Sequence, residues 1–340
     1  ASYVKRISFQ IMTIHASRAT RGEYGRGADS VRAEETCMGT RSKEGIMTTS
    51  TLVPKEVLGV YRPGSAHMVG DGFPVRNLFP SNELDQAVDP FLLLDYAGPQ
   101  AFEPTEHPRG VGEHPHRGFE TVTIMYQGAV AHRDSAGNAG VIGPGDVQWM
   151  TAASGVVHEE LHEADWAKKG GTFQAIQLWV NLPRSRKMSA PGYQTILNAQ
   201  IPNVELVGGA GHLRVIAGIF QGHKGPARTV TPVELYDLTL SAGGRAELSF
   251  PDGHNTSLFV LQGLVSANGS SDAGEAELIV CKRHGASVVI EAREDSRLLI
   301  LSGQPIGEPI ARYGPFVMNT KLELVQAVED YKAGKMGHLS

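Results

Sequence analysis

Hydrophobic and polar positions alternate from residue 53 onward in short runs, a pattern typical of β-strands. In the first half these runs lie at residues 121–126, 141–142, 147–150 and 173–180. Glycine-rich turn sequences separate them, as at Gly143-Pro144-Gly145-Asp146. No long helical pattern intervenes, so the spacing favours antiparallel sandwiches or small barrels.

The second half repeats this architecture after a polar, proline-punctuated break at residues 182–187. Its strand-like runs are residues 213–219, 235–240, 246–250, 258–264, 277–280, 287–290 and 298–301. The two halves barely match in sequence, yet their patterns predict two copies of one fold.

A helix is predicted near the C-terminus. Thr320 and Glu323 have the spacing of a capping box, and Gly334 provides a stop signal. The apolar positions between them are Leu322, Leu324, Val325, Val328 and Tyr331. We expect this helix to pack across a domain rather than to carry chemistry.

Composition narrows the function classes. A chain of 340 residues with a net charge of −5 suggests two domains and gives no sign of direct nucleic-acid binding. Its two cysteines, Cys37 and Cys281, form no disulfide framework, and no apolar run approaches the length of a membrane span. We therefore expect a soluble cytoplasmic protein, or a nuclear one if the source is eukaryotic.

Residues 1–46 differ from the rest, with eight Lys/Arg against five Asp/Glu and no persistent hydrophobic period. The pattern favours a disordered extension that ends near Met47, where the native protein would start. An organellar transit peptide is the alternative, because the segment contains many Arg and Ser residues, although its acidic residues argue against it.

Candidate chemistry begins at the sequence His114-Pro115-His116, which is followed by the β-branched run of residues 121–124. Residues i and i+2 of a strand share a face, so both imidazoles can converge on one point. His158 and Glu160 repeat this spacing about forty residues later. Three neutral nitrogens and one carboxylate would suit a divalent ion such as Fe, Mn, Co, Ni or Cu.

The sequence closely resembles the pirin family of bicupins. The resemblance rests on residues 114–121, 144–152, 158–160, 177–183 and 313–320, and it covers residues 53–337 in the right order. It implies an all-β chain of two cupin barrels with a C-terminal helix. The expected domains are a metal-binding cupin at 47–182, a second cupin without metal at 183–318, and the helix and tail at 319–340.

The resemblance also implies a site and an activity. Carried over by position, the metal ligands would be His114, His116, His158 and Glu160, and the usual metal in this family is iron, as Fe(II). Family members act as quercetin 2,3-dioxygenases, which cleave a flavonol with O₂ and release carbon monoxide. Glu160 would accept the proton of the flavonol 3-hydroxyl. A monomer suffices, since one chain already pairs two barrels.

Two alternatives concern the same residues. In cupins generally the carboxylate ligand follows the first two histidines closely, which here would be Glu120 instead of Glu160. The run His158-Glu159-Glu160-Leu161-His162 also matches the HExxH motif of zinc proteases, which requires a helix. A further alternative is a non-catalytic regulator, because other family members are nuclear transcription co-regulators whose metal would alter a partner-binding surface.

The remaining histidines are weaker candidates. His132 could point into the cavity, although a hydrogen-bonded structural role is the simpler interpretation, and His107 could line an entrance. His254 and His284 are isolated in the second half. No second metal site is expected there, and that domain would be structural or would close over the first.

Overall fold

The computed structural model describes residues 52–81, 83–270 and 272–339. The predictions for residues 1–46 lie outside these residues. Antiparallel strands dominate, and the runs expected from the sequence are confirmed in both halves. No helix of the described part has the length and apolar character needed to cross a membrane.

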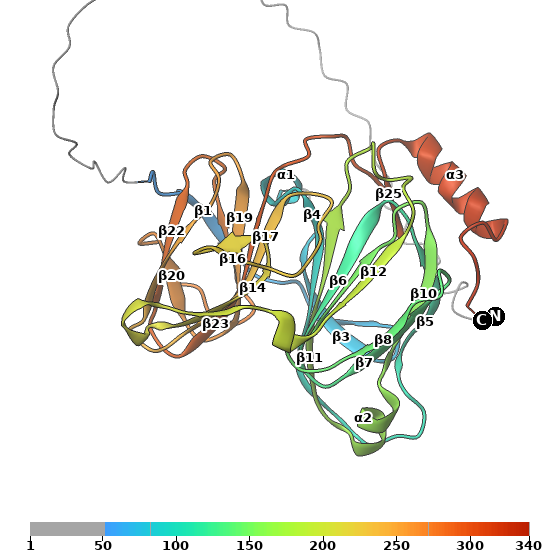
Figure 1. Cartoon of the computed structure of the whole chain (residues 1–340), viewed down its shortest axis with the longest axis horizontal. Helices are drawn as coiled ribbons and strands as arrows, with labels where there is room; N and C mark the ends of the chain where they lie inside the picture. Colours follow the sequence, from blue (N-terminus) through green and yellow to red (C-terminus); the bar gives the residue numbers. More distant parts are fainter. Residues whose placement is uncertain (1–51, 82, 271, 340) are drawn as a thin grey trace, which may run out of the picture. The chain divides into compact units, whose positions relative to one another are not determined.

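The first barrel pairs a seven-stranded sheet with a four-stranded sheet (Figure 1). In spatial order the larger sheet contains β12 (Gly192–Ile196), β9 (Val147–Thr151), β6 (Phe119–Gln127), β11 (Gly171–Asn181), β4 (Phe91–Phe102), β3 (Phe73–Phe79) and β2 (His67–Val69). The smaller sheet contains β5 (Gly110–His116), β10 (Val156–His162), β7 (Val130–Asp134) and β8 (Ala139–Ile142). Helices α1 (Asp85–Val88) and α2 (Ala164–Lys169) lie in its connections.

The second barrel has the same plan, with a seven-stranded and a three-stranded sheet. The larger sheet contains β1 (Val57–Tyr61), β21 (Leu278–Cys281), β19 (Asn255–Gln262), β23 (Ser296–Gly303), β17 (Val233–Leu240), β14 (Gly211–Ala217) and β13 (Asn203–Glu205). The smaller contains β18 (Arg245–Ser249), β22 (Ser287–Ala292) and β20 (Val265–Ala267). Four short elements lie in the connections between β12 and β17, namely η1 (Asn198–Gln200), η2 (Val207–Gly209), β15 (Ile219–Phe220) and β16 (His223–Lys224).

One apolar core joins the two large sheets. It includes Val122, Ile124 and Tyr126 of β6 together with Phe259 and Leu301 from the second barrel. Because side chains alternate along a strand, these β6 residues face the junction, and the intervening ones face the interior of the first barrel. The interface thereby fixes which β6 side chains can reach a site inside the barrel.

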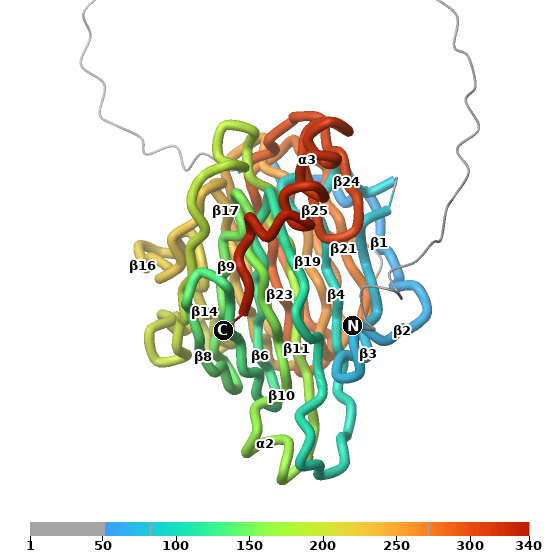
Figure 2. The backbone as a smooth tube through the Cα atoms, turned by 90° about the vertical axis from the view of Figure 1, so that its right-hand side faces the viewer, coloured from blue at the N-terminus to red at the C-terminus, as the bar shows by residue number. Residues whose placement is uncertain are grey.

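Each barrel also receives a strand from the opposite end of the chain. β1 pairs with β21 of the second barrel, although it precedes the whole first barrel in sequence. Strands β24 (Ala311–Tyr313) and β25 (Phe316–Met318) and helix α3 (Lys321–Lys332) return to the first barrel (Figures 1 and 2). There Phe316 forms an isolated parallel β-bridge with Arg117, and Ser135 Oγ donates a hydrogen bond to the Met336 carbonyl. The predicted domain boundaries, 47–182 and 183–318, remain a prediction.

The predicted capping of α3 is confirmed. Thr320 Oγ1 accepts a hydrogen bond from the Glu323 amide, and the Glu323 carboxylate accepts one from the Asn319 amide. Only part of the expected apolar face is covered, since Leu324 is buried whereas Leu322 and Val325 are exposed. The helix packs on the first barrel through Leu324 and Ala327, in one cluster with Val157 of β10.

Candidate metal centre

The three histidines predicted as metal ligands converge inside the first barrel. β10 runs antiparallel to β5, and His158 lies directly opposite His114. The ring centroids of His158 are 4.2 Å from His114 and 4.8 Å from His116. Each ring offers a nitrogen within 4.8 Å of the other two, so the three residues could hold one metal ion.

Hydrogen bonds behind the rings orient their nitrogens. His114 Nδ1 is 2.8 Å from the Gly112 carbonyl oxygen, and His116 Nδ1 is 3.4 Å from the Pro315 carbonyl oxygen. Both contacts favour a proton on Nδ1 and leave Nε2 as the electron-pair donor. The Nε2 atom of His158 is buried and has no hydrogen-bond partner within the described part of the chain. An unpaired buried nitrogen beside two free imidazole nitrogens fits a metal-binding role.

Burial keeps these rings neutral. Desolvation lowers the pKa of His114, and it lowers the pKa values of His116 and His158 still further. Neutral imidazoles have the free electron pairs that a divalent transition metal requires. The donor set of the cluster therefore fits such a metal.

Glu160 lies beside this cluster and is held by two neighbouring side chains. Gln148 Nε2 donates to its Oε1 atom at 3.0 Å, and the Thr123 hydroxyl, 3.1 Å from the same atom, shares its one proton between Glu160 and Gln177 Oε1 at 2.7 Å. Its Oε2 atom has no hydrogen-bond partner among the described residues, so it is available to a metal or a proton. The geometry groups Glu160 with His158 and His132 rather than with His114 and His116. His158 belongs to both groups, which makes the two groups contiguous.

A bulge in β5 determines this offset. Opposite β10, the register of β5 shifts between His158, which faces His114, and Glu160, which faces Val111. β5 therefore has one extra residue at this point, whereas β10 keeps a regular register with β7, where Glu160 lies opposite His132. A short sequence pattern carries no information on such a shift.

Glu120, the alternative carboxylate, points away from the histidines. It alternates on β6 with Thr121 and Thr123, and Thr123 is the residue that contacts Glu160. Glu120 instead accepts a hydrogen bond from Thr151 Oγ1, at 2.7 Å, on the face that forms the junction with the second barrel. Burial raises its pKa to about 7. This geometry favours Glu160 over Glu120 as the carboxylate of the site.

The protease alternative is wrong, because His158 and His162 both lie on strand β10 and not on a helix. His162 is turned into an aromatic cluster at the far end of the strand. It stacks on Phe173 with 4.9 Å between ring centroids, and its Nε2 is 3.0 Å from the Gly72 carbonyl oxygen. It therefore has the environment of a structural histidine.

Aromatic and aliphatic side chains fill the barrel interior around the site. On one side His116 contacts the rings of Phe119 and Trp179, at centroid distances of 5.2 and 5.3 Å. On the other side, Met125, Phe173 and Ile142 belong to an apolar cluster. His116 and His158 are buried, while His114 is partly exposed. His114 is therefore the most solvent-accessible of the three histidines.

The C-terminal segment supports the strand that carries the site. The Pro315 carbonyl lies against His116, and Arg117 forms a buried ion pair with Asp330 of α3 at 2.8 Å. Lys187 Nζ donates hydrogen bonds to the carbonyl oxygens of Gly118 and Val317. At Gly118 a Cβ atom would collide with the Val317 oxygen, and φ is +91°, so only glycine fits there.

Sequence reasoning missed several residues that orient the candidate ligands. These are Thr123, Gln148, Asp134 and Tyr193. A usable signal existed for Asp134, because His132 and Asp134 have the same i, i+2 spacing as the predicted ligands. Gln148 stood out as a polar residue within the apolar run of residues 147–150.

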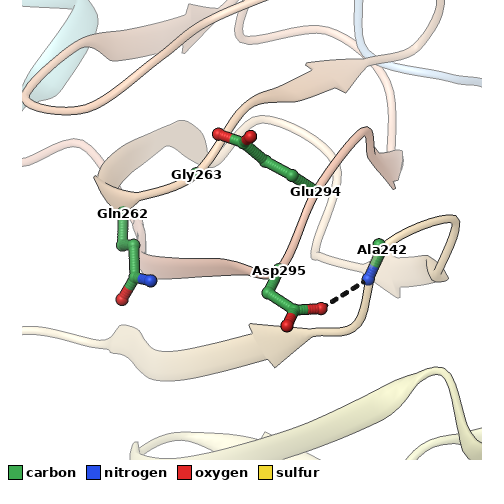
Figure 3. A pocket seen from close by; sticks show the side chains of 5 residues that line it. All are labelled: Ala242, Gln262, Gly263, Glu294 and Asp295. Carbon is green, nitrogen blue, oxygen red and sulfur yellow. Dashed lines mark hydrogen bonds between the residues drawn. The ribbon is translucent and has the colours of Figure 1, made fainter.

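The other candidates do not join the site. His107 is exposed in the loop between β4 and β5. His254 pairs with Glu234, and His284 lies 3.5 Å from Asp252. A depression on the second barrel is lined by Ala242, Gln262, Gly263, Glu294 and Asp295, and contains no histidine (Figure 3). Within residues 52–81, 83–270 and 272–339, both groups that could hold a metal lie in the first barrel.

Comparisons with known proteins agree with the fold and the site. The family described as Pirin matches residues 72–180, and the Pirin C-terminal cupin domain matches residues 235–337. A crystal structure of quercetin 2,3-dioxygenase from Acinetobacter baumannii superposes with a TM-score of 0.82 at 48% identity, covering 84% of this chain and 100% of that one.

Two relatives extend this likeness. A Pseudomonas aeruginosa protein, provisionally named a quercetin 2,3-dioxygenase, is 53% identical over 83% of this chain and 98% of its own length. A pirin-like protein of Solanum lycopersicum is 40% identical over 87% of this chain and 96% of its own length. The two-barrel architecture, the histidine cluster and these matches lead to one conclusion: the chain belongs to the pirin family.

Proposed function

We propose that this protein is a metal-dependent dioxygenase that opens the central ring of a flavonol, quercetin or a close analogue, with O₂. The observation that carries the proposal is the convergence of His114, His116 and His158, with Glu160 adjoining, in the largely buried interior of the first barrel. The activity named for the Acinetobacter and Pseudomonas relatives supplies the reaction class.

The proposed ligands are His114, His116, His158 and Glu160, with Fe(II) as the metal. Mn, Co, Ni and Cu suit the same donors. When bound, the metal would lower the pKa of a coordinating flavonol hydroxyl and supply the redox chemistry with O₂. The protein's own contribution lies in holding the ligands, moving a proton and limiting access of water.

Glu160 is the proposed proton acceptor. The Gln148 amide donates to Oε1 and the Thr123 hydroxyl contacts the same atom, which orients the carboxylate and leaves Oε2 to take the proton of the flavonol 3-hydroxyl. The rings of Phe119 and Trp179 beside His116 would exclude water and pack against an aromatic substrate. Partly exposed His114 marks the side from which the substrate enters.

The test is aerobic incubation of the iron-loaded protein with quercetin, following loss of flavonol absorbance and release of carbon monoxide. Glu160→Gln should retain much of the metal and lose turnover by about 10²-fold or more, since a positioned general base contributes about that much. The matched control is Glu159→Gln. Glu159 precedes Glu160 on β10 but pairs with Arg133 at 2.6 Å on the other face, so this variant should turn over normally.

Two results would contradict the proposal. Turnover at the wild-type rate in Glu160→Gln would eliminate the base assignment. No loss of quercetin at full metal occupancy would eliminate the dioxygenase itself, and would favour the alternative in which the metal regulates binding of a protein partner.

A further inference from the structure

His132 contacts the candidate site but has no role as a ligand in the proposed function. It lies on β7, its side chain is fully buried, and its Nδ1 is 3.4 Å from Nδ1 of His158. Its ring stacks on Tyr193, with 4.7 Å between centroids and 15° between planes. A histidine held this firmly against a candidate ligand requires an explanation.

The protons around His132 can be assigned from its neighbours. The Asp134 carboxylate accepts hydrogen bonds from the backbone amides of Ala136 and Asn138, and from the Asn138 side chain. A carboxylate with these partners is an acceptor, so His132 Nε2, 3.3 Å from Asp134 Oδ2, carries a proton and donates it.

The second nitrogen of His132 must then be an acceptor. Gln148 turns its side-chain N–H toward Nδ1 at 3.3 Å, while its amide oxygen accepts from Tyr193, so Nδ1 has the free electron pair. Nδ1 of His158 lies 3.4 Å from this electron pair, and an unprotonated nitrogen at that position would place two electron pairs against each other. His158 therefore carries its proton on Nδ1, and the electron pair of its Nε2 faces His114 and His116.

This arrangement distinguishes His158 from the other two histidines. Backbone carbonyl oxygens lie behind Nδ1 of His114 and His116, whereas a side-chain relay ending in a carboxylate lies behind His158. A carboxylate behind a ligating imidazole fixes its tautomer and strengthens it as an electron-pair donor. Gln148 belongs to the same network and also donates to Glu160, so one set of hydrogen bonds orients two proposed ligands.

We propose that Asp134 and His132 are positioning residues that hold His158 in its Nδ1-protonated tautomer and strengthen its bond to the metal. The inference rests on the metal site of the proposed function but not on the identity of the substrate. A competing interpretation is a second metal between His132, His158 and Glu160, which also lie within 4.8 Å of one another. With a metal in each group, His158 would have to bind one ion through each of its two ring nitrogens. The second ion would also compete with the hydrogen bonds that Gln148 donates to His132 and Glu160.

The test measures Co²⁺ binding to the full chain by competition with a chelator, together with the visible absorption spectrum of the Co²⁺ form. Asp134→Asn keeps an oxygen for the backbone amides but turns an N–H donor toward His132 Nε2. His132 would then carry its proton on Nδ1, facing the proton of His158. His132→Gln removes the ring altogether.

Both variants should bind Co²⁺ about 10- to 100-fold more weakly, the usual effect of losing such a partner, and with an altered spectrum. His162→Gln is the matched control, because His162 is a buried histidine on the same strand as His158, but its ring hydrogen-bonds to the Gly72 carbonyl and not to the candidate ligands. It should bind Co²⁺ like the wild type.

Three results would overturn the relay. One is wild-type affinity and spectrum in a folded Asp134→Asn or His132→Gln protein. Another is two Co²⁺ ions per wild-type chain and one in His132→Gln, which would establish the second metal. The third is absence of Co²⁺ binding by the wild type, which would refute the metal site itself. That result is distinct from a failure confined to the variants.

Discussion

The buried ion pair between Arg117 and Asp330 gives a quantitative test of how the C-terminal segment supports the site. The Arg117 side chain is 4% exposed and that of Asp330 is 11% exposed, with 2.8 Å between them. Arg117 directly follows the candidate ligand His116, and its Nε also donates to the Ser154 carbonyl at 2.6 Å. Asp330→Asn removes the charge while it preserves the size of the side chain.

We expect this change to lower the free energy of unfolding by about 3 kcal/mol, because it leaves the guanidinium of Arg117 buried without a counter-charge. Hydrogen bonds from Lys335, Arg117 and Gln326 hold the pKa of Asp330 well below its usual value of 3.8. A depressed pKa gives stability that is complete above that usual value and is lost only as the pH falls further. The full effect is therefore measurable at pH 7.

Urea unfolding at pH 7 is the assay, and Lys335→Ala is the matched control. Lys335 contacts the same carboxylate at 2.8 Å, but its side chain is 64% exposed, so its loss should cost less than about 1 kcal/mol. In an Arg117→Gln background the cost of Asp330→Asn should shrink, because the unpaired charge is gone. A loss below 1 kcal/mol in Asp330→Asn, or an equal loss in Lys335→Ala, would refute the reasoning.

Two further predictions concern side chains that the proposed site excludes. Since the pKa of Glu120 is about 7 in the folded protein and 4.5 is its usual value, stability should fall by about 3 kcal/mol as pH rises from 4.5 to above 7. Glu120→Gln should remove this slope in urea unfolding at pH 5 and pH 8, and an unchanged slope would contradict the assignment. His162→Gln should lose about 1–3 kcal/mol of stability yet retain its metal by elemental analysis, whereas loss of metal would restore the HExxH interpretation.

The sequence predicted those features that depend on local periodicity. The i, i+2 spacing placed His114 with His116, and strand pairing brought His158 opposite His114. Alternation within β6 also determines that Glu120 cannot share a face with Thr123, although the sequence alone does not show which face is the interior. That choice depends on the junction with the second barrel, which covers Val122 and Ile124.

Other features depend on contacts between distant segments and had no local signal. The bulge that offsets Glu160 arises from the register of β5 against β10. The Pro315 carbonyl reaches His116 across 199 positions of the chain, and Asp330 reaches Arg117 across 213. Residues such as Tyr193 and Gln148 become neighbours of His132 only when β12, β9 and β7 have assembled.

The N-terminal strand β1 pairs in the second barrel and the C-terminal segment packs on the first, and this exchange affects how the protein folds during synthesis. During synthesis the strands bearing His114 and His158 leave the ribosome long before Pro315 and Asp330 do, so His116 and Arg117 lack these contacts until nearly the whole described chain has emerged. The sheet of the second barrel is completed by β1, which is synthesised before the strands of the first barrel. Neither half can be transplanted or expressed by a simple cut between the barrels without losing a strand. Each barrel therefore depends on one continuous chain for its complete set of contacts.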